Sequence, residues 1–471
     1  MATNERARGK TVKPAIPVAV RQGSRERQYA EGKAIRNTCS RASHADWKAP
    51  ADRADPIKIL EASNKGRIPK LIPIRYGRMI PSPFVFFRGA AAIMAADLAH
   101  TPATGIRVQT CGDAHLMNFG AFATPERHVI FGINDFDETL PAPWEWDIKR
   151  LATSFLIASR NNGFSEADVR KTALSCVRSY RERMAEFSQM PTLDVWYARL
   201  DLETILPSIK DQETQKRLQR RLQKAEPSQV HEVDFSKLVT LETGEPTIRN
   251  HPPLIYHLRE QGGPEFEAKV ADAFAGYRES LPEERRVLVD RYQIKDFAIK
   301  VVGVGSVGTF CGVMLMMADV DDPLFLQVKE AGMSVLEPHA GKSIYANHGQ
   351  RVVDGERLMQ SASDIFLGWT ENREGRHFYV RQLHDMKIKM PVELFTLKVM
   401  VQYAEYCGWA LARAHARAGQ PALIAGYLGK GDQFDEAVAD FAIRYAEQNE
   451  CDYEALVRAV RQGRIEVYTE S

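Results

Sequence analysis

Three apolar runs, the first two separated by a glycine-rich turn, constrain the fold more than any other part of this 471-residue sequence. The runs cover 296–302, 309–317 and 324–328, and the turn reads GVGSVG over 303–308. The second run is rich in valine, methionine and phenylalanine and contains a glycine, so it is poorly suited to form a helix. An Asp-Asp-Pro turn separates it from the third run. The sequence therefore predicts three consecutive strands joined by turns.

The spacing of the glycines fits two phosphate-binding designs. In a dinucleotide-binding unit the glycines lead from a strand into a helix, with an acidic residue about twenty positions later, and Glu330 roughly has that spacing. In a kinase the glycines form a hairpin over ATP phosphates, and the next strand carries a lysine. Lys329 ends the third apolar run and matches that lysine. The strand-like second run favours the hairpin, and an ordinary turn with a surface lysine is the alternative without function.

The stretch 111–147 holds a second group of polar residues. Asp113 is followed by Asn118, and the apolar segment 128–133 leads into the NDFDE run at 134–138. An aspartate, an asparagine at this spacing, a strand pair and a further aspartate are typical of a kinase catalytic loop and its metal-binding segment. Both halves of a kinase-type site are therefore present.

The two halves occur in reverse order. In ordinary kinases the glycine loop and lysine come first, and a helix with a glutamate, a hinge, a long helix and the catalytic loop follow. Here the catalytic loop comes first, and the long helix expected at 394–418 comes late. Joining that helix to Gly112 would restore the usual order, and permutation is tolerated where chain termini lie close together. We therefore expect an α+β, two-lobed, kinase-like fold that is circularly permuted, with chance coincidence of motifs in two separate domains as the alternative.

Composition and patterning divide the chain into regions. We expect a basic, disordered arm over 1–45, a helical catalytic-loop lobe over 46–290, an antiparallel β nucleotide lobe over 291–390, and C-terminal helices over 391–471 that pack back on the helical lobe. The proline-broken segment 71–87 is expected to be extended. A short strand is expected at 378–383, and further helices at 148–160, 165–187, 353–367, 433–449 and 452–462.

The overall composition argues against several classes of protein. A net charge of +2 at pH 7 speaks against a general nucleic-acid-binding surface. No apolar run approaches the roughly 18 residues of a membrane span, and the polar N-terminus lacks the apolar core of a secretion signal. The six cysteines are scattered without zinc-site spacing. We expect a cytoplasmic protein with reduced thiols and no membrane partner, and its oligomeric state is open.

Several long motifs are similar to those of one family. They resemble motifs of the bacterial family catalogued as domain of unknown function 2252. The segments that carry the resemblance are RYGRMIPSPFVFFRGAAAIMAADLA, CGDAHLMNFG, GVGSVGTFCGVMLMM, QVKEAGMSVLEP, HGQRVVDGERLMQSASDIFLGW and GWALARAHARAG. The resemblance extends from about residue 43 to the C-terminus. It implies a remote likeness to the protein-kinase-like superfamily, especially aminoglycoside and other small-molecule phosphotransferases, and it brings no settled substrate.

The resemblance also implies roles for individual residues. Asp113 corresponds to the catalytic aspartate that orients and deprotonates a hydroxyl, Lys329 to the lysine that binds the α- and β-phosphates, and Asp147 to an aspartate that braces the catalytic loop. Asn118 and Asp135 correspond to two Mg²⁺ ligands, hard oxygen donors that suit this ion. The loop residues that would form a flexible cover over the ATP phosphates are Gly303, Gly305, Ser306 and Gly308.

The sequence departs from the kinase pattern at three places. Cys111 replaces the histidine that usually stands two residues before the catalytic aspartate. The metal segment reads Asp-Phe-Asp rather than Asp-Phe-Gly, so Asp137 is either a second metal ligand or a surface turn residue. The carboxylate partner of Lys329 is either Glu356 or Asp354, both on the expected helix 353–367.

These expectations together describe an ATP- and Mg²⁺-dependent phosphotransferase that acts on a hydroxyl of a small molecule or protein. The alternatives are a nucleotidyl (AMP) transferase, a non-catalytic nucleotide-binding pseudokinase and a dinucleotide-binding oxidoreductase, because a fold does not fix a reaction. His115 is expected to be structural, since Asp113 already fills the role of base. Arg75, Arg78 and Arg88 stand next to apolar material and would form either salt bridges or phosphate contacts.

Overall fold

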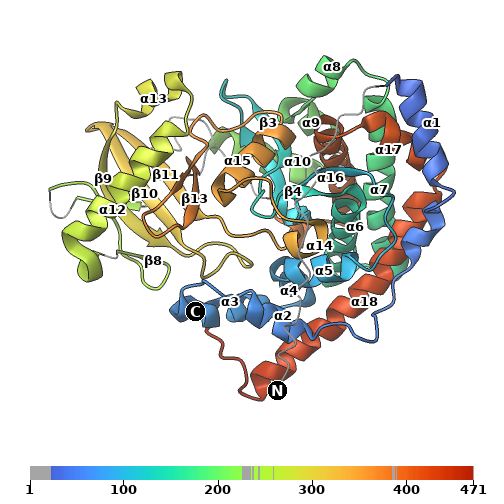
Figure 1. The fold of residues 1–471 in the computed structure, drawn as a ribbon, viewed down its shortest axis with the longest axis horizontal. Helices are drawn as coiled ribbons and strands as arrows, with labels where there is room; N and C mark the ends of the chain where they lie inside the picture. Colours follow the sequence, from blue (N-terminus) through green and yellow to red (C-terminus); the bar gives the residue numbers. More distant parts are fainter. Residues whose placement is uncertain are drawn as a thin grey trace, which may run out of the picture.

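The chain folds into an α+β structure in which a β-sheet lies beside a larger helical part (Figure 1). The computed structural model describes residues 23–469, except for 210, 225–234, 236–237, 242–243, 258, 384–387 and 389. In Figure 1 the sheet lies at the left in yellow and orange, and the helices that follow the acidic stretch lie at the right. All strand pairs in the described part are antiparallel.

The largest sheet has the strand order β12-β13-β11-β10-β9-β8. Its strands are β8 (Ile255–Tyr256), β9 (Gln293–Lys300), β10 (Cys311–Asp319), β11 (Asp322–Glu330), β12 (Gly368–Glu371) and β13 (His377–Gln382). The predicted apolar strands and the strand expected at 378–383 are therefore present as β9, β10, β11 and β13. Alternate residues of β10 point into two different apolar clusters, Met314 and Met316 into one and Val313 and Leu315 into the other. Burial on both faces explains why these strands are continuous apolar runs.

The glycine-rich turn joins two antiparallel strands. Gly312 of β10 pairs with Ile299 of β9, so the chain reverses direction over 301–310. A dinucleotide-binding unit needs a parallel strand pair with a helical crossover. The interpretation of these glycines as part of such a unit is therefore wrong, and the predicted hairpin is correct.

Long helices form the core of the other part of the molecule. They are α6 (Trp144–Asn161), α7 (Glu166–Phe187), α16 (Leu397–Ala418), α17 (Pro421–Leu428) and α18 (Gln433–Arg461). Helix α16 packs very closely on α7, because a Cβ at Gly408 would lie 2.3 Å from the Cys176 carbonyl oxygen. Trp144 and Tyr180 stack in the core with a centroid distance of 5.6 Å. The C-terminal helices thus pack on the helices that follow the acidic stretch.

Helix α18 is continuous, whereas two helices were predicted at 433–449 and 452–462. Asp452, the first residue of the second predicted helix, follows the expected break directly, and its side chain is only 5% exposed. It accepts two hydrogen bonds from Arg53, which also binds Asp97 of α5 (Ala91–Leu98). This buried ion-pair network lies in the middle of the helix, so the polar residues there are an inward contact and not a turn.

The segment 23–45, expected to belong to a disordered arm, is helical and packed. It forms α1 (Arg25–Ile35) and the 3-10 helix η1 (Arg41–Ala45). Helix α1 lies against α17, where a Cβ at Gly32 would be 2.0 Å from the Leu423 carbonyl oxygen. This part of the prediction is wrong because contact through small residues leaves little apolar signal in the sequence. Residues 1–22 lie outside the described residues.

The segment 71–87, predicted to be extended, is also helical. It contains the end of η2 (Pro69–Leu71), then α3 (Ile72–Met79) and most of α4 (Pro83–Gly89). Pro73 and Pro83 stand in the first turns of α3 and α4, where a missing N–H costs nothing because it has no helical acceptor. Ser82 caps α4 by accepting a hydrogen bond from Val85 N. The prolines therefore start helices here and do not interrupt strands.

Shorter elements complete the described chain. The remaining helices are α2 (Pro56–Ala62), η3 (Leu116–Asn118), α8 (Thr192–Tyr197), α9 (Leu202–Ser208), α10 (Gln212–Lys224), α12 (Arg259–Glu279), α13 (Glu283–Val289), α14 (Glu337–Ala340), α15 (His348–Met359) and η4 (Val392–Leu394). The remaining strands are β1 (Arg107–Thr110), β2 (Phe119–Ala123), β3 (Val129–Ile133), β4 (Leu140–Pro143), β5 (Leu200–Asp201), β6 (Val239–Thr240) and β7 (Thr247–Ile248). Helix α15 ends earlier than the expected helix 353–367.

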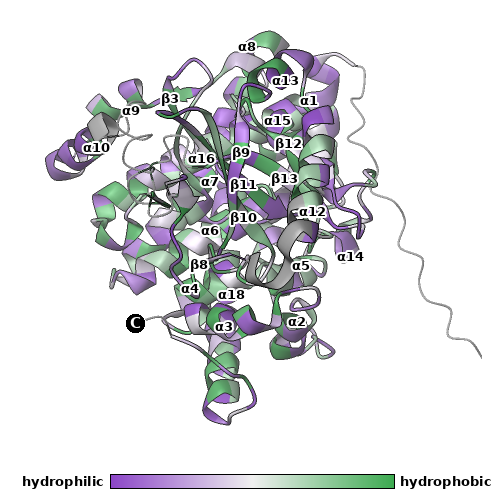
Figure 2. Ribbon diagram, turned by 90° about the vertical axis from the view of Figure 1, so that its left-hand side faces the viewer, coloured by the Kyte–Doolittle hydropathy of each residue, from purple (hydrophilic) through white to green (hydrophobic). Residues whose placement is uncertain are grey.

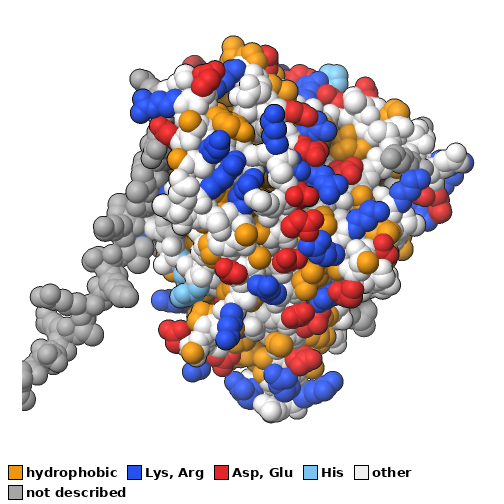
Figure 3. Space-filling view, turned by 90° about the vertical axis from the view of Figure 1, so that its right-hand side faces the viewer, with side chains coloured by type: hydrophobic (Ala, Val, Ile, Leu, Met, Phe, Trp, Pro, Cys, Tyr) orange, Lys and Arg blue, Asp and Glu red, His pale blue; other side chains and the backbone are white. Residues whose placement is uncertain are grey.

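The surface carries interspersed charge. Helix α10 is largely hydrophilic and projects from the body in Figure 2. Figure 3 shows basic and acidic side chains mixed over the face formed by the right-hand helices of Figure 1. Within the described ranges, no helix combines the length and the apolar character needed to cross a membrane.

Candidate functional site

Helix α6 holds the loop that begins at Cys111. The backbone N–H groups of Cys111 and Gly112 donate to the Asp147 carboxylate at 2.8 and 3.0 Å. Asp147 lies in the first turn of α6, which starts earlier than the predicted 148–160, and it is buried. His415 of α16 contacts the same carboxylate at 3.2 Å, and Tyr180 hydrogen-bonds the other ring nitrogen of His415. Asp147 thus has the geometry of a brace for the loop.

One turn further along α6, Arg150 holds Asp113. Its Nε lies 2.6 Å and its Nη2 2.5 Å from Asp113 Oδ1. The other oxygen, Oδ2, lies 3.8 Å from His115 Nε2. Asn118 donates from Nδ2 to the Asp113 carbonyl at 2.9 Å, which closes the loop. Asp113 is therefore fixed through one oxygen, and the second has no hydrogen bond within the described part of the chain.

Electrostatics around Asp113 favour a carboxyl that can take up a proton. Burial raises the pKa of Asp113, and the guanidinium of Arg150 opposes this shift. Burial, with the charges of Arg88 and Arg150, holds the pKa of His115 well below its usual range. His115 is therefore neutral at pH 7, and its Nδ1 has no hydrogen-bond partner among the described residues. A structural role for His115 stays the prediction.

Lys329 of β11 contacts the acidic segment directly. Its Nζ donates to Asp137 Oδ2 at 2.6 Å, and the Tyr379 hydroxyl of β13 donates to Asp137 Oδ1 at 2.5 Å. Tyr379 is paired with Lys329 across the two strands. Burial alone would raise the pKa of Asp137, but Lys329, Tyr379 and Arg381 bring it below its usual value. The lysine of the glycine hairpin and the Asp-Phe-Asp segment therefore form one site.

This contact decides the partner of Lys329. Asp137 is the carboxylate that binds it, so the expectation of Glu356 or Asp354 is wrong. Glu356 is buried on α15 and lies near Arg381, whose pKa it helps to raise. Asp354 interacts instead with Gln350 and Tyr345. The sequence could not reveal this because Asp137 precedes Lys329 by 192 residues.

The glycine loop is docked on the segment before the acidic stretch. Ile68 N donates to the Gly308 carbonyl at 2.7 Å, and Arg78 Nη1 donates to the Gly303 carbonyl at 2.7 Å. Val307 is fully buried, and its carbonyl accepts from Arg67. Within the loop, Ser306 Oγ donates to the Val302 carbonyl. Gly303 and Gly308 have φ angles of 75° and 90° and permit the tight path. The expected flexible cover is therefore a loop anchored at several points.

The three arginines singled out in the sequence have different surroundings. Arg75 donates to the Asn64 side chain and the Leu60 carbonyl, and Arg78 to the glycine loop. The Nε of Arg88 is shielded from solvent and has no hydrogen-bond partner in the described ranges. Arg75 and Arg78 are thus bound to protein groups, whereas Arg88 is not.

Four side chains of the site were missed from the sequence: Arg150, Arg351, Tyr379 and Arg381. Arg351 of α15 donates to the carbonyl oxygens of Asp137 and Thr139, which fixes the end of the acidic segment. The sequence held a signal for the other three. Tyr379 and Arg381 alternate on a predicted strand, so they share one face. Arg150 follows Asp147 by one helical turn and so shares its side of α6.

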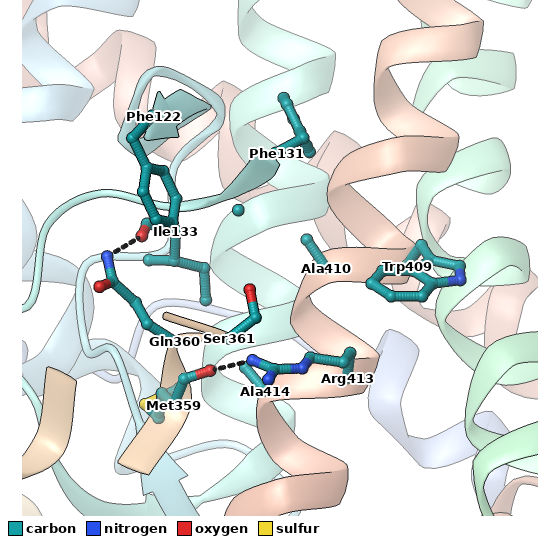
Figure 4. Close-up of a pocket in the computed structure, with 11 residues that line it drawn as sticks. Phe122, Phe131, Ile133, Met359, Gln360, Ser361, Trp409, Ala410, Arg413 and Ala414 are labelled. Atoms are coloured by element: carbon teal, nitrogen blue, oxygen red, sulfur yellow. Dashed lines mark hydrogen bonds between the residues drawn. The ribbon is translucent and has the colours of Figure 1, made fainter. Parts of the chain in front are cut away.

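A small cavity lies between β3, the end of α15 and α16 (Figure 4). The space between its lining residues, including solvent at its mouth, is about 270 Å³. Gln360 Nε2 donates across it to the Ile133 carbonyl at 2.8 Å, and Arg413 Nη1 donates to the Met359 carbonyl at 2.7 Å. None of the residues predicted for catalysis lines it. The cavity is therefore separate from the site around Lys329.

Two arginines of α16 secure the C-terminal end of α15. Arg413 donates to the Met359 carbonyl, and Arg417 donates to the Arg357 and Gln360 carbonyls. Cationic groups stabilise the C-terminal ends of helices. Burial and the neighbouring Arg417 lower the pKa of Arg413 to about 8. These contacts position the helix that carries Arg351 and Glu356.

The residues present fit Mg²⁺ only with help from a substrate. No group of three His, Cys, Asp or Glu side chains in the described part forms a ready metal cage. Mg²⁺ at phosphoryl-transfer sites usually takes one or two carboxylates and completes its shell with phosphate and water. Burial and the charge of Asp137 raise the pKa of Asp135. Asn134, the residue before Asp135, donates from its backbone N–H to the Asn118 carbonyl, which brings Asn118 close to Asp135 in the chain fold. Asp135 and Asn118 can therefore supply two oxygen ligands, while Asp137 is occupied by Lys329.

Fold and site together define an α+β protein in which a lysine of an antiparallel sheet meets an acidic loop of a helical part. The chain belongs to the family described as an uncharacterized protein conserved in bacteria (DUF2252), whose model matches residues 67–459. No curated protein matched the sequence, and no solved structure matched it.

Proposed function

We propose that this chain is an ATP- and Mg²⁺-dependent phosphotransferase of circularly permuted kinase-like fold, which acts on a hydroxyl group. The observation that carries the proposal is the contact of Lys329 with Asp137. A lysine that follows a glycine hairpin meets the aspartates that follow a catalytic-type loop, as in kinases. Coincidence of two unrelated motifs in separate domains would not require this contact.

The permuted order accounts for the arrangement of the helices. Helix α16 follows the sheet in sequence and packs on α7 and β1, next to the start of the acidic loop. It would correspond to the long helix that precedes the catalytic loop in ordinary kinases. Helix α15 follows β11 and carries Arg351 toward the acidic segment, where kinases place the helix with the glutamate.

The proposed reaction follows from the geometry of Asp113. Its free oxygen, Oδ2, would accept the proton of the acceptor hydroxyl, while Arg150 keeps the carboxylate in place. The acceptor oxygen forms a bond to the γ-phosphorus, the bond from that phosphorus to the β,γ-bridging oxygen breaks, and ADP leaves with the electron pair. Lys329 would bind the α- and β-phosphates after giving up part of its contact with Asp137. Mg²⁺, held by Asp135 and Asn118, would neutralise phosphate charge.

Radiolabel transfer tests the proposal. Purified protein is incubated with γ-labelled or α-labelled ATP, Mg²⁺, and fractionated metabolites and proteins of a bacterial extract. We expect transfer from the γ-labelled nucleotide only, and its loss in Asp113→Asn by about a hundredfold or more. Asp354→Asn is the matched control, because this carboxylate lies on α15 and does not bind Lys329.

Each other result has a defined meaning. Transfer from α-labelled ATP would replace the proposal with nucleotidyl transfer. Stabilisation by Mg²⁺-ATP in a thermal melt without any transfer would indicate a pseudokinase. Full transfer by Asp113→Asn would show that Asp113 is not the base.

A further inference from the structure

Arg88 is an unusual cation in this site. It stands in the last turn of α4, and burial lowers its pKa. Its Nε is shielded from water and has no hydrogen-bond partner among the described residues. Arg88 is half-buried, and partial desolvation of a charged group is unfavourable unless a partner compensates for the lost water. Arg88 is therefore a half-buried cation whose Nε has no hydrogen-bond partner in the described part of the chain.

Arg88 lies between the two halves of the site, the glycine loop and the loop that carries Asp113. A Cβ at Gly305 would lie 3.3 Å from the Arg88 carbonyl oxygen, so this residue touches the glycine loop. The adjacent Phe87 carbonyl accepts a hydrogen bond from Arg150 Nη2, and Arg150 holds Asp113. Arg88 is close enough to Asp113 for each charge to shift the pKa of the other.

Protein groups near Arg88 do not provide the missing partner. Asp113 is engaged by Arg150 through Oδ1, and His115 is neutral. Glu393 attracts Arg88 through space without an ion pair. An oxyanion between the glycine loop and Asp113 would satisfy the guanidinium, whose planar donors fit two phosphate oxygens.

We propose that Arg88 is a catalytic residue that binds the terminal phosphate of the nucleotide during its transfer. This inference rests on the proposed function, since it assumes that ATP occupies the site. As the bond to the β,γ-bridging oxygen breaks, negative charge spreads over the three equatorial oxygens of the transferring group. Arg88 donates hydrogen bonds to these oxygens, and it comes from a segment that ordinary kinase order does not place there.

Two ligands that differ by one phosphate test the assignment. Affinities of Mg²⁺-ADP and of the non-hydrolysable β,γ-imido analogue of ATP are measured by calorimetry. We expect wild type to prefer the analogue and Arg88→Met to lose about tenfold of that preference, because the charge-assisted hydrogen bond to the third phosphate is then absent. The rate of transfer should fall by about a thousandfold or more. Arg88→Lys, which keeps the charge, should retain part of the preference and guards against a folding defect.

Arg78→Met is the matched control. It removes a neighbouring arginine that donates to the Gly303 carbonyl of the glycine loop, so it should change both affinities by the same factor. An equal effect of Arg88→Met on both ligands, or no effect, would overturn the assignment. An effect on the KM of the acceptor alone would also overturn it and would place an acceptor anion on Arg88. If wild type binds neither nucleotide, the proposed function itself fails.

Discussion

The ion pair between Lys329 and Asp137 makes a quantitative prediction about stability. The side chain of Lys329 is 5% exposed and that of Asp137 27% exposed. Removing one member of a buried pair costs about 3–5 kcal/mol, because the other charge is left without compensation. In Lys329→Met, the Tyr379 hydroxyl and Arg381 still act on Asp137. We therefore expect a loss of about 3 kcal/mol in the free energy of unfolding, at the low end of that range.

A double-mutant cycle separates this pair from its surroundings. Asp137→Asn should also destabilise, and the double variant should be less destabilised than the sum of both by about 2 kcal/mol. Unfolding by urea is followed through tryptophan fluorescence, with Trp369 of β12 in the same sheet as Lys329. The dependence on urea should keep its slope, since the buried area is unchanged. A coupling energy near zero would refute the contact, and with it the reason for joining the two halves of the site.

Two further perturbations have definite outcomes. Gly112→Ala should lower the free energy of unfolding by more than about 2 kcal/mol, because φ is 80° and the new Cβ would lie 2.3 Å from the Glu138 carbonyl oxygen. Gly105→Ala is the control in the same urea assay. Gly105 has a similar φ of 77° but lies in open space, so this substitution should cost only the backbone strain. Burial raises the pKa of Glu138 to about 7 against the opposing charge of Arg351, so the native state favours the protonated carboxyl and loses stability as the pH rises from about 4.3 to 7. Glu138→Gln removes this titration, and its stability relative to wild type should therefore increase between pH 5 and pH 8; a constant difference across that range would contradict the assignment.

The strands could be predicted from the sequence because burial on both faces makes their signal continuous. Prediction was wrong where local and tertiary signals conflict. Pro73 and Pro83 suggested extended chain, yet each occupies a first helical turn in which proline is tolerated. Helix α1 has a weak apolar pattern because it contacts α17 through Gly32.

The candidate site divides in the same way. Asp113, Asn118 and Asp135 could be selected as candidates because the motif is local, and Lys329 could be selected from its strand. The partner of Lys329 was not, since nothing in a sequence relates Asp137 to a residue far downstream until the sheet docks. Arg88 was noted as a possible phosphate contact, but only the structure separates it from Arg75 and Arg78, which bind protein groups.

The separation of 192 residues between Asp137 and Lys329 also matters while the chain is being made. At about 5–20 residues per second, a ribosome needs roughly 10–40 s to synthesise the stretch between them. During that time the acidic segment has left the ribosome but its lysine does not yet exist, so Asp137 remains hydrated or protonated. The first half of the chain therefore has to wait for β11 to emerge before its carboxylates can be buried, and a nascent chain arrested before Lys329 should expose this segment to proteases.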